Sequence, residues 1–360
     1  MSRKMLFIIN EWAMSKCVDA QNMFDDKQGL TGSETSIVMF AEAAYSLGND
    51  VTLFGNFKEE TTWRGVKVKT FQSWQSLTQC KFDVVFSWIH PEPLKFFSDS
   101  IRVFNQQVND FHYCAGWEEY VDIITSPSQT HKEYLMQFSN FPETNWKVLP
   151  NCCDPSVFFP SEPVFNKKLI YASSPDRGLH WLLEAFPKIK KHVPDVTLDV
   201  FYDWDLFFER FKALENETAQ RLRFCNEMFE RLKSFGVKHN KSVSKNEMAK
   251  ILKNSQILAY PCDPVCFTEG FSVTTLEAAA SGCLPVICGA DALQSIYEDY
   301  TPVVKAPFSC HKQEYIDIIV EMLLDKEKYL QARQNAVRLS SVYEWKKVFS
   351  AFQETCLNNI

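Results

Sequence analysis

The sequence predicts an α/β protein made of two Rossmann-like domains, and three observations lead to this prediction. The chain has 360 residues, which corresponds to about two domains at the usual ~100 to 200 residues each. Short apolar runs alternate with segments of helical periodicity, which is typical of a parallel sheet covered by helices. This alternation stops at residues 141–168, which are rich in Pro, Asn and polar side chains, and starts again after them.

The interruption divides the chain into domains. We expect an N-terminal domain over residues 1–160, a second domain over residues 161–340, and a C-terminal helix over residues 341–360 that returns to the first domain. Two Rossmann-like domains joined by a linker would face each other with the carboxyl edges of their sheets, and ligands of such folds bind at that edge. We therefore expect a ligand-binding cleft between them.

The first half of the chain contains five runs that we interpret as buried strands and two segments that we interpret as helices. The expected strands are MLFIIN, DVTLFG, FDVVFSWI, IRVFNQ and YVDIITSP, and the expected helices are SETSIVMFAEAAYSLG and SQTHKEYLMQF. Continuous apolar runs of this length are typical of strands that are covered on both faces. The opening MSRKMLFIINEWAM has a basic start, but its apolar part is too short for a secretory signal and is better interpreted as the first strand.

The second half repeats the pattern. The expected strands are KLIYASS, VTLDVFYDW, QILAYP and CLPVI, and the expected helices are LHWLLEAFPKIKKHVP, MAKILKNS and the segment that starts near Ser272. The last helix, in YEWKKVFSAFQETCL, has Trp345, Phe349 and Phe352 available for packing.

Composition excludes several classes of protein. The chain is 46% hydrophobic and 14% aromatic, with 30 Phe, which is typical of a globular protein rather than a disordered one. A formal net charge of -7 argues against a nucleic-acid partner. No apolar run approaches the ~20 residues of a membrane-spanning helix, so membrane contact would be peripheral. Twelve cysteines without regular spacing indicate reduced thiols, and we expect a cytoplasmic location.

Three short patterns could ligate a metal ion. They are Cys152 with Cys153, Cys262 with Cys266, and Asp203 with Asp205. None has a matching set of further ligands nearby in the sequence, so we expect no metal site.

Two acids surround a helix start in FTEGFSVTTLEAAASGCLPVI. Glu269 precedes Gly270, and Glu277 lies eight positions later. The N–H groups of Gly270, Phe271 and Ser272 would point to the carboxyl edge of the sheet, where they suit a phosphate. Acids on either side cannot bind that phosphate as well, so they would hold neutral hydroxyls, such as a sugar on one side and a ribose on the other. The alternative is a capped helix with two solvated glutamates.

A second helix start carries a cation. In YASSPDRGLHWLLEAF a strand ends at Ala172, and Arg177–Gly178 opens a helix. The dipole disfavours a cation at the start of a helix, so the placement of Arg177 calls for a reason. A guanidinium there can bind diphosphate oxygens that gain charge as a bond breaks. The alternative is a surface arginine.

The first domain offers weaker candidates. Gly29, Gly32 and Ser33 form a loop that enters a helix, which could receive a phosphate or an acceptor or could be an ordinary turn. His90 follows an expected strand and would lie near the rim of the cleft, and His112 has a similar position with less support. Motifs of serine hydrolases, Walker-type NTPases and dinucleotide-binding dehydrogenases are missing from the sequence.

Four of these segments occur in the same order in glycosyltransferase family 4. They are GSETSIVMFAEAAYSLGNDVTLFG, LPNCCDPSVFFP, SSPDRGLHWLLEAF and EGFSVTTLE. The chain resembles that family over most of its length. The family consists of GT-B-fold, retaining enzymes that use nucleotide-diphosphate sugars, so the resemblance implies an acceptor-side first domain and a donor-side second domain.

The resemblance also implies roles for single residues. Glu269 would lie by the hydroxyls of the donor sugar, Glu277 would hold the ribose, and the N–H groups of Phe271 and Ser272 would hold the diphosphate. Arg177 stands where the family usually has the lysine of a Lys-Gly pair that binds the leaving phosphates. The expected site comprises the catalytic residues Arg177 and Glu269, the donor-binding residues Gly32, Ser173, Gly270, Phe271, Ser272 and Glu277, and the acceptor-side candidates His90 and Gln107.

The sequence departs from the family at three places. Ala172–Ser173 replaces a Gly-Arg pair, so Arg177 is the one strong cation evident at the phosphates. The linker has Cys152–Cys153 where Gly-Val is usual, and Gln106 or Gln107 replaces a first-domain histidine. The last change removes an acid or base and affects the acceptor side more than donor binding.

The expected function is retaining, metal-independent glycosyl transfer without a cofactor. A hexose or deoxyhexose would pass from a UDP- or GDP-sugar to a hydroxyl of a glycan, a glycolipid or another acceptor. The acceptor would attack from the face that the diphosphate leaves, and Arg177 and the helix start would stabilise the leaving charge. The alternatives are a non-catalytic sugar-nucleotide-binding protein and a sugar-nucleotide epimerase, both with the same fold.

Overall fold

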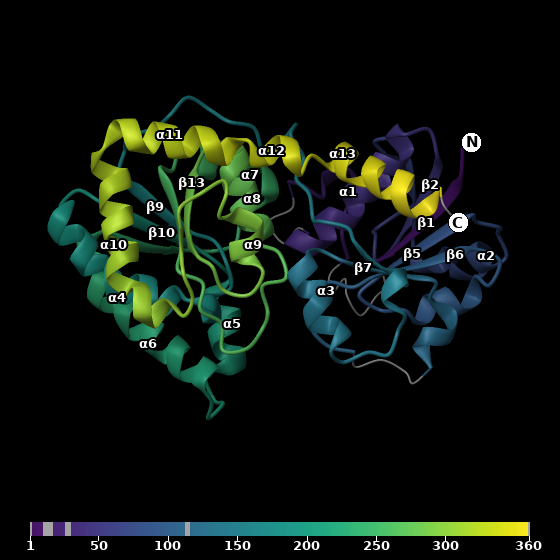
Figure 1. Ribbon diagram of the computed structural model, residues 1–360, viewed down its shortest axis with the longest axis horizontal. Helices are drawn as coiled ribbons and strands as arrows, with labels where there is room; N and C mark the ends of the chain where they lie inside the picture. Colours follow the sequence, from purple (N-terminus) through teal and green to yellow (C-terminus); the bar gives the residue numbers. More distant parts are fainter. Residues whose placement is uncertain (1, 10–16, 26–29, 112–115, 359–360) are drawn as a thin grey trace. The chain divides into compact units, whose positions relative to one another are not determined.

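The computed structural model describes residues 2–9, 17–25, 30–111 and 116–358. The chain divides into two compact units. Unit 1 comprises Met1–Asp154 together with Val342–Ile360, and unit 2 comprises Pro155–Ser341. Each unit contains one sheet of mainly parallel strands with helices packed on it, so the predicted α/β class is confirmed (Figure 1).

The described part of unit 1 contains an eight-stranded sheet with the order β3-β4-β2-β1-β5-β6-β7-β8. The strands are β1 (Lys4–Ile9), β2 (Asp50–Phe54), β3 (Thr61–Trp63), β4 (Val66–Lys69), β5 (Val84–Trp88), β6 (Ile101–Asn105), β7 (Ile123–Ser126) and β8 (Trp146–Val148). All neighbouring pairs are parallel except β3 with β4. The five strands expected from apolar runs are all present. The short strands β3, β4 and β8, at or next to the edges of the sheet, were not predicted.

Helices cover both faces of this sheet. They are α1 (Gly32–Ser46), α2 (Trp74–Thr78), α3 (Gln129–Met136), α13 (Trp345–Phe352) and the π-helical turn η8 (Gln353–Leu357). Short 3-10 helices are η1 (Ala20–Asn22), η2 (Phe71–Ser73), η3 (Glu92–Phe96), η4 (Trp117–Tyr120) and η5 (Glu143–Asn145). The helix expected at the C-terminal end of the chain is present as α13, and its predicted packing residues are buried.

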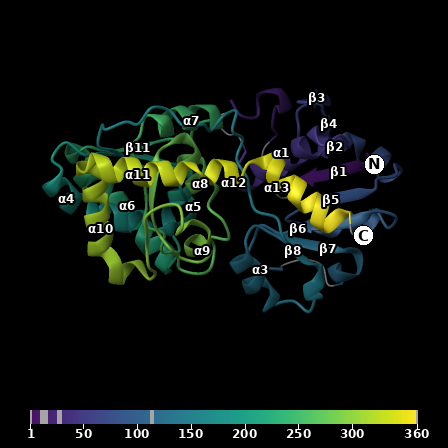
Figure 2. The ribbon, with the colours of Figure 1, turned by 45° about the horizontal axis from the view of Figure 1, so that its top comes forward.

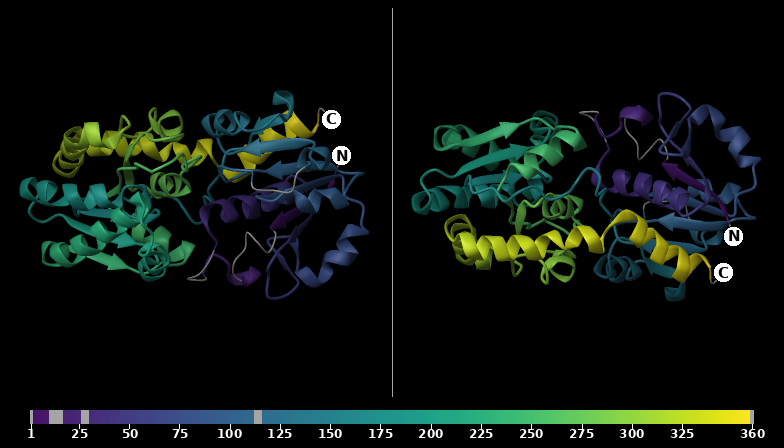
Figure 3. Two further views of the ribbon diagram at one scale, coloured as in Figure 1. Left: turned by 90° about the horizontal axis from the view of Figure 1, so that it is seen from below. Right: turned by 90° about the horizontal axis from the view of Figure 1, so that it is seen from above.

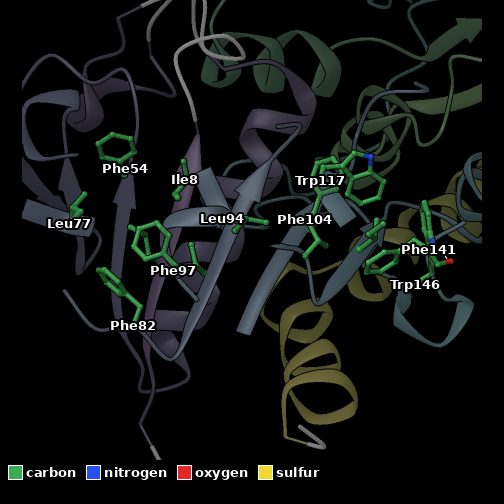
Figure 4. Packing of buried hydrophobic residues seen from close by; sticks show 14 of the residues in the cluster. Ile8, Phe54, Leu77, Phe82, Leu94, Phe97, Phe104, Trp117, Phe141 and Trp146 are labelled. Carbon is green, nitrogen blue, oxygen red and sulfur yellow. Dashed lines mark hydrogen bonds between the residues drawn. The ribbon is translucent and has the colours of Figure 1, made fainter. Parts of the chain in front are cut away.

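Side chains along β1 point alternately to the two faces of the sheet, so the core of unit 1 has two layers. Phe7 stacks on Phe86 and contacts Phe349 of α13, on the face that α1 shares. Leu6 and Ile8 point the other way, into a cluster that includes Phe104, Trp117 and Trp146 (Figure 4). A sheet buried on both faces explains why its central strands β1 and β5 are apolar at most positions.

The boundary between the units follows Asp154, inside the expected linker of residues 141–168 and before the expected domain end at residue 160, and the first part of that linker belongs to unit 1. Trp146–Val148 forms β8 at the edge of the first sheet, and Trp146 is 2% exposed. Unit 1 continues to Asp154. The three-residue strand is too short to give a periodic signal, and the surrounding Pro and Asn residues are typical of a loop.

Unit 2 contains a six-stranded sheet among its described residues, with the order β11-β10-β9-β12-β13-β14. The strands are β9 (Lys168–Tyr171), β10 (Thr197–Phe201), β11 (Val237–Asn240), β12 (Ile257–Tyr260), β13 (Leu284–Cys288) and β14 (Val303–Val304). Every neighbouring pair is parallel, which brings the carboxyl ends of the strands to one edge.

Helices follow most of the strands of unit 2 along the chain. They are α4 (Leu179–His192), α5 (Trp204–Phe211), α6 (Glu217–Leu232), α7 (Lys245–Lys253), α8 (Val273–Ser281), α9 (Leu293–Tyr297), α10 (Phe308–Leu324), α11 (Lys326–Val337) and α12 (Leu339–Val342, which reaches the first residue of unit 1), with the 3-10 turns η6 (Pro175–Arg177) and η7 (Lys233–Phe235). Helices α4, α6 and α10 pack together, and α8 packs with α7 and α11 (Figures 2 and 3). Leu182, Leu183 and Phe186 of α4 are fully buried.

In the part of the chain that the structure describes, none of the helices combines the length and apolar character that crossing a membrane requires.

Candidate active site

The strand, loop, helix and strand predicted around the two acids are present. The loop after β12 leads into α8, and β13 then pairs with β12 in parallel. Ser272 is the N-cap of α8, where its Oγ accepts a hydrogen bond from Thr275 N at 3.3 Å. Gly282 ends the helix with φ of 80°.

Glu269 is buried and held by two side chains from other segments. It is 4% exposed, and it accepts hydrogen bonds from Arg177 Nη1 at Oε1 and from Tyr260 Oη at Oε2, the latter at 2.9 Å. Burial raises the pKa of Glu269 above its usual value, although Arg177 and Tyr260 act in the opposite direction. Burial also raises the pKa of the Tyr260 hydroxyl, which therefore keeps its proton and donates.

The backbone that carries Glu269 is fixed by Asp291. The Asp291 carboxylate accepts hydrogen bonds from Thr268 N at 2.8 Å and from Glu269 N at 2.9 Å through the same oxygen, Oδ2. Ala292 N returns a hydrogen bond to Glu269 O at 3.2 Å. Asp291 has φ of 52°, a left-handed conformation that Asp tolerates better than most residues. The loop after β13 thus fixes the position of the first acid.

Arg177 reaches Glu269 because Gly178 lets two loops meet. Gly178 has φ of 120°, and a Cβ there would lie 2.0 Å from Pro261 O. Asp263 N donates to Arg177 O at 3.2 Å, which joins the loop before α4 to the loop after β12. Although burial opposes its charge, the nearby Glu269 carboxylate raises the pKa of Arg177. Arg177 Nε is buried and has no acceptor among the described residues.

Glu277 is buried with a lysine. It is 2% exposed, and Lys245 Nζ from the first turn of α7 donates to its Oε1. Burial raises the pKa of Glu277, and Lys245 partly opposes this shift. The alternative of two solvated glutamates is therefore wrong for both acids.

The other donor-side candidates surround the start of α8. Ser173 is half-buried in the loop after β9, and Thr274 Oγ1 donates to the neighbouring Ala172 O at 3.4 Å. Gly270 and Phe271 are buried, and the Phe271 ring lies 6.0 Å from the ring of Tyr297. Unit 2 therefore brings Arg177, Ser173, Glu269, Gly270, Phe271, Ser272 and Glu277 to segments that contact one another.

Gly32 lies at a helix start of a different kind in unit 1. It is the first residue of α1, whose N-cap Thr31 forms a capping box with Glu34. Glu34 is 7% exposed, so a buried carboxylate occupies this N-terminus. A neutral hydroxyl suits such a site better than a phosphate does. Gly29 lies outside the described residues.

His90 follows β5 at a strained point of the backbone. Ile89 has φ of 64°, which is unusual for a β-branched residue, and its N–H donates to Asn105 O at 2.9 Å. His90 is partly buried, and burial lowers the pKa of its imidazole, although Glu92 and Asp110 act in the opposite direction. His112 lies outside the described residues.

Gln107 belongs to a chain of neutral side chains at the carboxyl edge of the first sheet. Asn151 Nδ2 donates to Gln107 Oε1 at 3.0 Å, Gln107 Nε2 donates to Asn105 Oδ1 at 3.2 Å, and Asn105 Nδ2 donates to Thr125 Oγ1 at 2.8 Å. Among the described residues, Asn151 Oδ1 and the nearby buried Ser126 Oγ have no hydrogen-bond partner. Gln106 instead donates to Asp110 O at 2.8 Å.

Three residues of the site were not predicted from the sequence. They are Tyr260, Asp291 and Lys245. Lys245 could have been found by the same argument as Arg177, because it is a cation in the first turn of a helix. Tyr260 ends an apolar strand and Asp291 lies in a loop, so their hydrogen bonds to the Glu269 segment leave no sequence signal.

The three metal-binding patterns do not form clusters. No group of three or more His, Cys, Asp and Glu side chains with metal-binding geometry occurs in the described ranges. Asp203 is the N-cap residue of α5 and Asp205 lies in its first turn. Cys152, Cys153 and Cys262 are buried, and burial raises the pKa of the Cys152 and Cys262 thiols, which disfavours the thiolate form that binds metals.

Comparisons with known proteins identify similar folds. Residues 167–338 match the model of the family described as glycosyl transferases group 1. Comparison with curated protein sequences found no match.

Solved structures resemble the whole chain at low sequence identity. HepE from Anabaena, solved in complex with UDP and glucose, has a TM-score of 0.69 and 14% identity over 99% of this chain and 100% of its own. Sucrose-phosphate synthase from Thermosynechococcus elongatus has a TM-score of 0.68 and 10% identity over 99% of each chain. AviGT4, a glycosyltransferase involved in avilamycin A biosynthesis, has a TM-score of 0.66 and 15% identity, covering 98% of this chain and 96% of its own. These similarities support the two-domain GT-B fold.

Proposed function

Because residues 167–338 match the model of glycosyl transferases group 1 and the whole chain has the GT-B fold, we propose that the protein transfers a sugar from a nucleotide-diphosphate donor to an acceptor hydroxyl. HepE, one of the similar structures, was solved with UDP-glucose, which favours UDP as the first nucleotide to test. The proposed donor is a UDP- or GDP-linked hexose or deoxyhexose. The proposed acceptor is a glycan, a glycolipid or another hydroxyl compound.

One observation carries the proposal: two buried acids, each paired with a cation, flank the N-terminus of α8. Glu269 is paired with Arg177 and Glu277 with Lys245. A donor with a diphosphate between two polyhydroxyl groups matches this order, because amides at a helix start bind anions and carboxylates accept from hydroxyls. We assign Gly270, Phe271 and Ser272 to the diphosphate, as the sequence predicts.

Arg177 would stabilise the charge of the leaving diphosphate. Glu269 holds its Nη1, and the guanidinium has further N–H groups that can donate to phosphate oxygens. As the glycosidic bond breaks, charge builds up on the diphosphate, and a fixed cation with the amides of α8 stabilises that charge. A single preorganised donor of this type contributes roughly 3–4 kcal/mol to lowering the barrier.

The acceptor would bind to unit 1, where the candidate groups are uncharged. The chain of Asn105, Gln107 and Asn151 supplies amide donors and acceptors, which suit the hydroxyls of a neutral acceptor. None of these amides is a general base at neutral pH. We therefore propose that a departing phosphate oxygen takes the proton of the attacking hydroxyl on the same face of the sugar, which retains the anomeric configuration and requires no metal. Cysteine usage favours a reducing compartment, and we propose the cytoplasm.

The experiment is a donor screen with the full-length protein. UDP-, GDP- and ADP-sugars are incubated with a panel of glycan, glycolipid and simple alcohol acceptors, with and without EDTA, and the products are analysed by mass spectrometry and NMR. We expect transfer from one class of donor, unchanged by EDTA, with the anomeric configuration of the donor kept.

Each other result contradicts a specific part of the proposal. An inverted anomer contradicts the front-face mechanism, and loss of activity with EDTA contradicts metal independence. Conversion of the donor into its epimer indicates an epimerase. Tight donor binding without turnover on any acceptor indicates a sugar-nucleotide-binding protein.

A further inference from the structure

One cation that the proposed mechanism does not use is buried with the second acid. Lys245 Nζ donates to Glu277 Oε1, and the two side chains are 14% and 3% exposed. The ammonium also lies 6.0 Å from the ring centroid of the buried Phe158. Both charges are thus largely withdrawn from water, and each requires the other, since an unpaired buried charge is strongly unfavourable.

Folding stability alone does not account for this ion pair. Buried ion pairs contribute little net stability, because the loss of hydration offsets the attraction between the charges, and apolar side chains of similar size serve as well. Lys245 is also the first residue of α7, where the helix dipole disfavours a cation. These two costs indicate that the pair has a role in binding.

Glu277 retains capacity to accept hydrogen bonds. A carboxylate can accept about four hydrogen bonds through its two oxygens. In the described part of the chain, Lys245 is the one donor to this carboxylate, and it takes Oε1. Glu277 lies about one turn into α8, beside the amides that we assign to the diphosphate. A second anion would be repelled there, so Oε2 suits hydroxyl groups.

We infer that Lys245 is a positioning residue for Glu277, holding one oxygen of the carboxylate so that the other accepts hydrogen bonds from the vicinal hydroxyls of the donor's ribose. The inference rests on the proposed function, because it requires a nucleotide at the start of α8. Lys245 restricts the rotation of the carboxylate and favours its ionised form. Arg333 of α11 also packs near α8, but it donates to Gly282 O at the opposite end of the helix.

Discrimination between ribose and deoxyribose tests this role in the full-length protein. Isothermal titration calorimetry gives the dissociation constants of UDP and 2′-deoxy-UDP, and of the corresponding GDP pair. We expect the wild type to bind the ribonucleotide about tenfold more tightly, because hydrogen bonds to a charged group are strong. In K245M the ratio is expected to fall below about threefold, whereas K245R, which keeps a cation, retains most of it.

Two outcomes with K245M would overturn the inference. A lysine with a purely structural role, or one that contacts the phosphates, would weaken both nucleotides equally and leave the ratio unchanged. A lysine that merely blocks Glu277 would give a larger ratio once it is removed.

Lys168 provides a matched control. It is the first residue of β9, at the amino edge of the same sheet, and its Nζ lies 2.6 Å from Asp199 Oδ2. We expect K168M to leave the ratio at its wild-type value.

A second variant keeps the test decisive if K245M does not fold. K245M/E277Q buries no charge at this position and lacks the proposed ribose acceptor. Equal affinity for UDP and 2′-deoxy-UDP in this variant supports the contact between ribose and Glu277 that the inference requires, and retained discrimination overturns the inference. A wild type that binds UDP or GDP without discriminating against the deoxy form also overturns the inference, while the proposed function stands. A wild type that binds neither nucleotide overturns the proposed function and the inference with it.

Discussion

At the scale of single residues, the site depends on acids whose charges are stabilised by neighbours far along the chain. Glu269 is paired with Arg177 and Tyr260, and Glu277 with Lys245. The sequence predicted the acids because they surround a helix start that suits a phosphate, and Arg177 because a cation is disfavoured at such a position. It did not predict which cation meets which acid, because that pairing depends on how strands β9 and β12 lie side by side.

Arg177→Ala is expected to separate catalysis from binding. We expect kcat to fall by about 10²- to 10³-fold, because the fixed donor to the leaving diphosphate is lost, while the affinity for the donor changes by only a few-fold. R177K is the control, since it keeps the charge but not the planar fork, and it should retain part of the activity. Steady-state kinetics and direct measurement of nucleotide binding check this. Equal losses in kcat and in affinity would show that Arg177 contributes only to binding of the donor.

Tyr260→Phe is expected to shift the pH dependence. The pKa of Glu269 is already raised by burial, and removing a hydrogen bond to its ionised form raises it further. In the proposed mechanism the ionised acid is the active form, so we expect activity to be lost as pH falls through this pKa. The acid limb of kcat/KM should therefore move to higher pH in Y260F.

Tyr315→Phe is the control for that measurement. Tyr315 is equally buried, but its hydroxyl donates to the backbone oxygen of Val286 at 3.1 Å. In Y315F the acid limb of kcat/KM should match that of the wild type. An unchanged limb in Y260F would show that Glu269 does not act as a carboxylate acceptor.

At the scale of elements, helix starts and tight loops position the site. The sequence predicted α8 correctly, because a possible Ser cap, a helical apolar pattern and a final Gly form a complete local signal. The sequence did not predict β3 and β4. These two strands form a hairpin at the edge of the sheet, and polar and charged residues alternate in them with apolar ones. Helices α5 and α6 were also missed, since the segment between β10 and β11 is mostly charged and aromatic without an apolar strand to mark its limits.

Ser272→Ala tests whether the α8 cap has a role beyond stability. Loss of an N-cap costs about 1 kcal/mol of unfolding free energy, and this should hold as well for Asn216→Ala at the start of α6, where Asn216 Oδ1 accepts from Ala219 N at 2.9 Å. Only S272A should also weaken UDP binding. Chemical denaturation and calorimetry of both variants give the comparison, and equal UDP affinity in the two would show that the Ser272 hydroxyl does not contribute to donor binding.

Gly178→Ala tests the close approach that places Arg177. The new Cβ would meet Pro261 O at 2.0 Å in a backbone with φ of 120°, so we expect a loss of about 3–5 kcal/mol in unfolding free energy. Gly48→Ala is the control. Gly48 has φ of 89° with nothing within 4 Å of its added Cβ, so only the conformational cost of about 1–2 kcal/mol remains. Similar losses in the two variants would show that the loops separate easily.

At the scale of the whole molecule, the fold class was predictable because the central parallel strands are mostly apolar and alternate with segments of helical periodicity. The limits of the first sheet were not, since β8 is an edge strand of three residues in a segment rich in Pro and Asn. The residues on the acceptor side could not be grouped from the sequence for a similar reason. The amides of Asn105, Gln107 and Asn151 lie on three separate segments, and only the folded sheet brings them together.

Phe349→Ala is expected to destabilise unit 1. The fully buried ring contacts Phe7, Phe40 and Phe86, so its removal should cost about 3–5 kcal/mol of unfolding free energy. Phe138→Ala is the control, because that ring is 61% exposed and its loss should cost less than about 1 kcal/mol. Urea denaturation measures both. A small effect in F349A would show that α13 adds little to the packing of the sheet.

The discontinuity of unit 1 has a consequence for biosynthesis. Its last segment, Val342–Ile360, follows all of Pro155–Ser341 in the chain. At translation speeds of about 5–20 residues per second, the ribosome needs on the order of 10–40 s to make the intervening residues. During that interval α13 does not yet cover its face of the nascent sheet, so the aromatic side chains of that face are exposed. A chaperone therefore has its main opportunity to bind before α13 emerges from the exit tunnel.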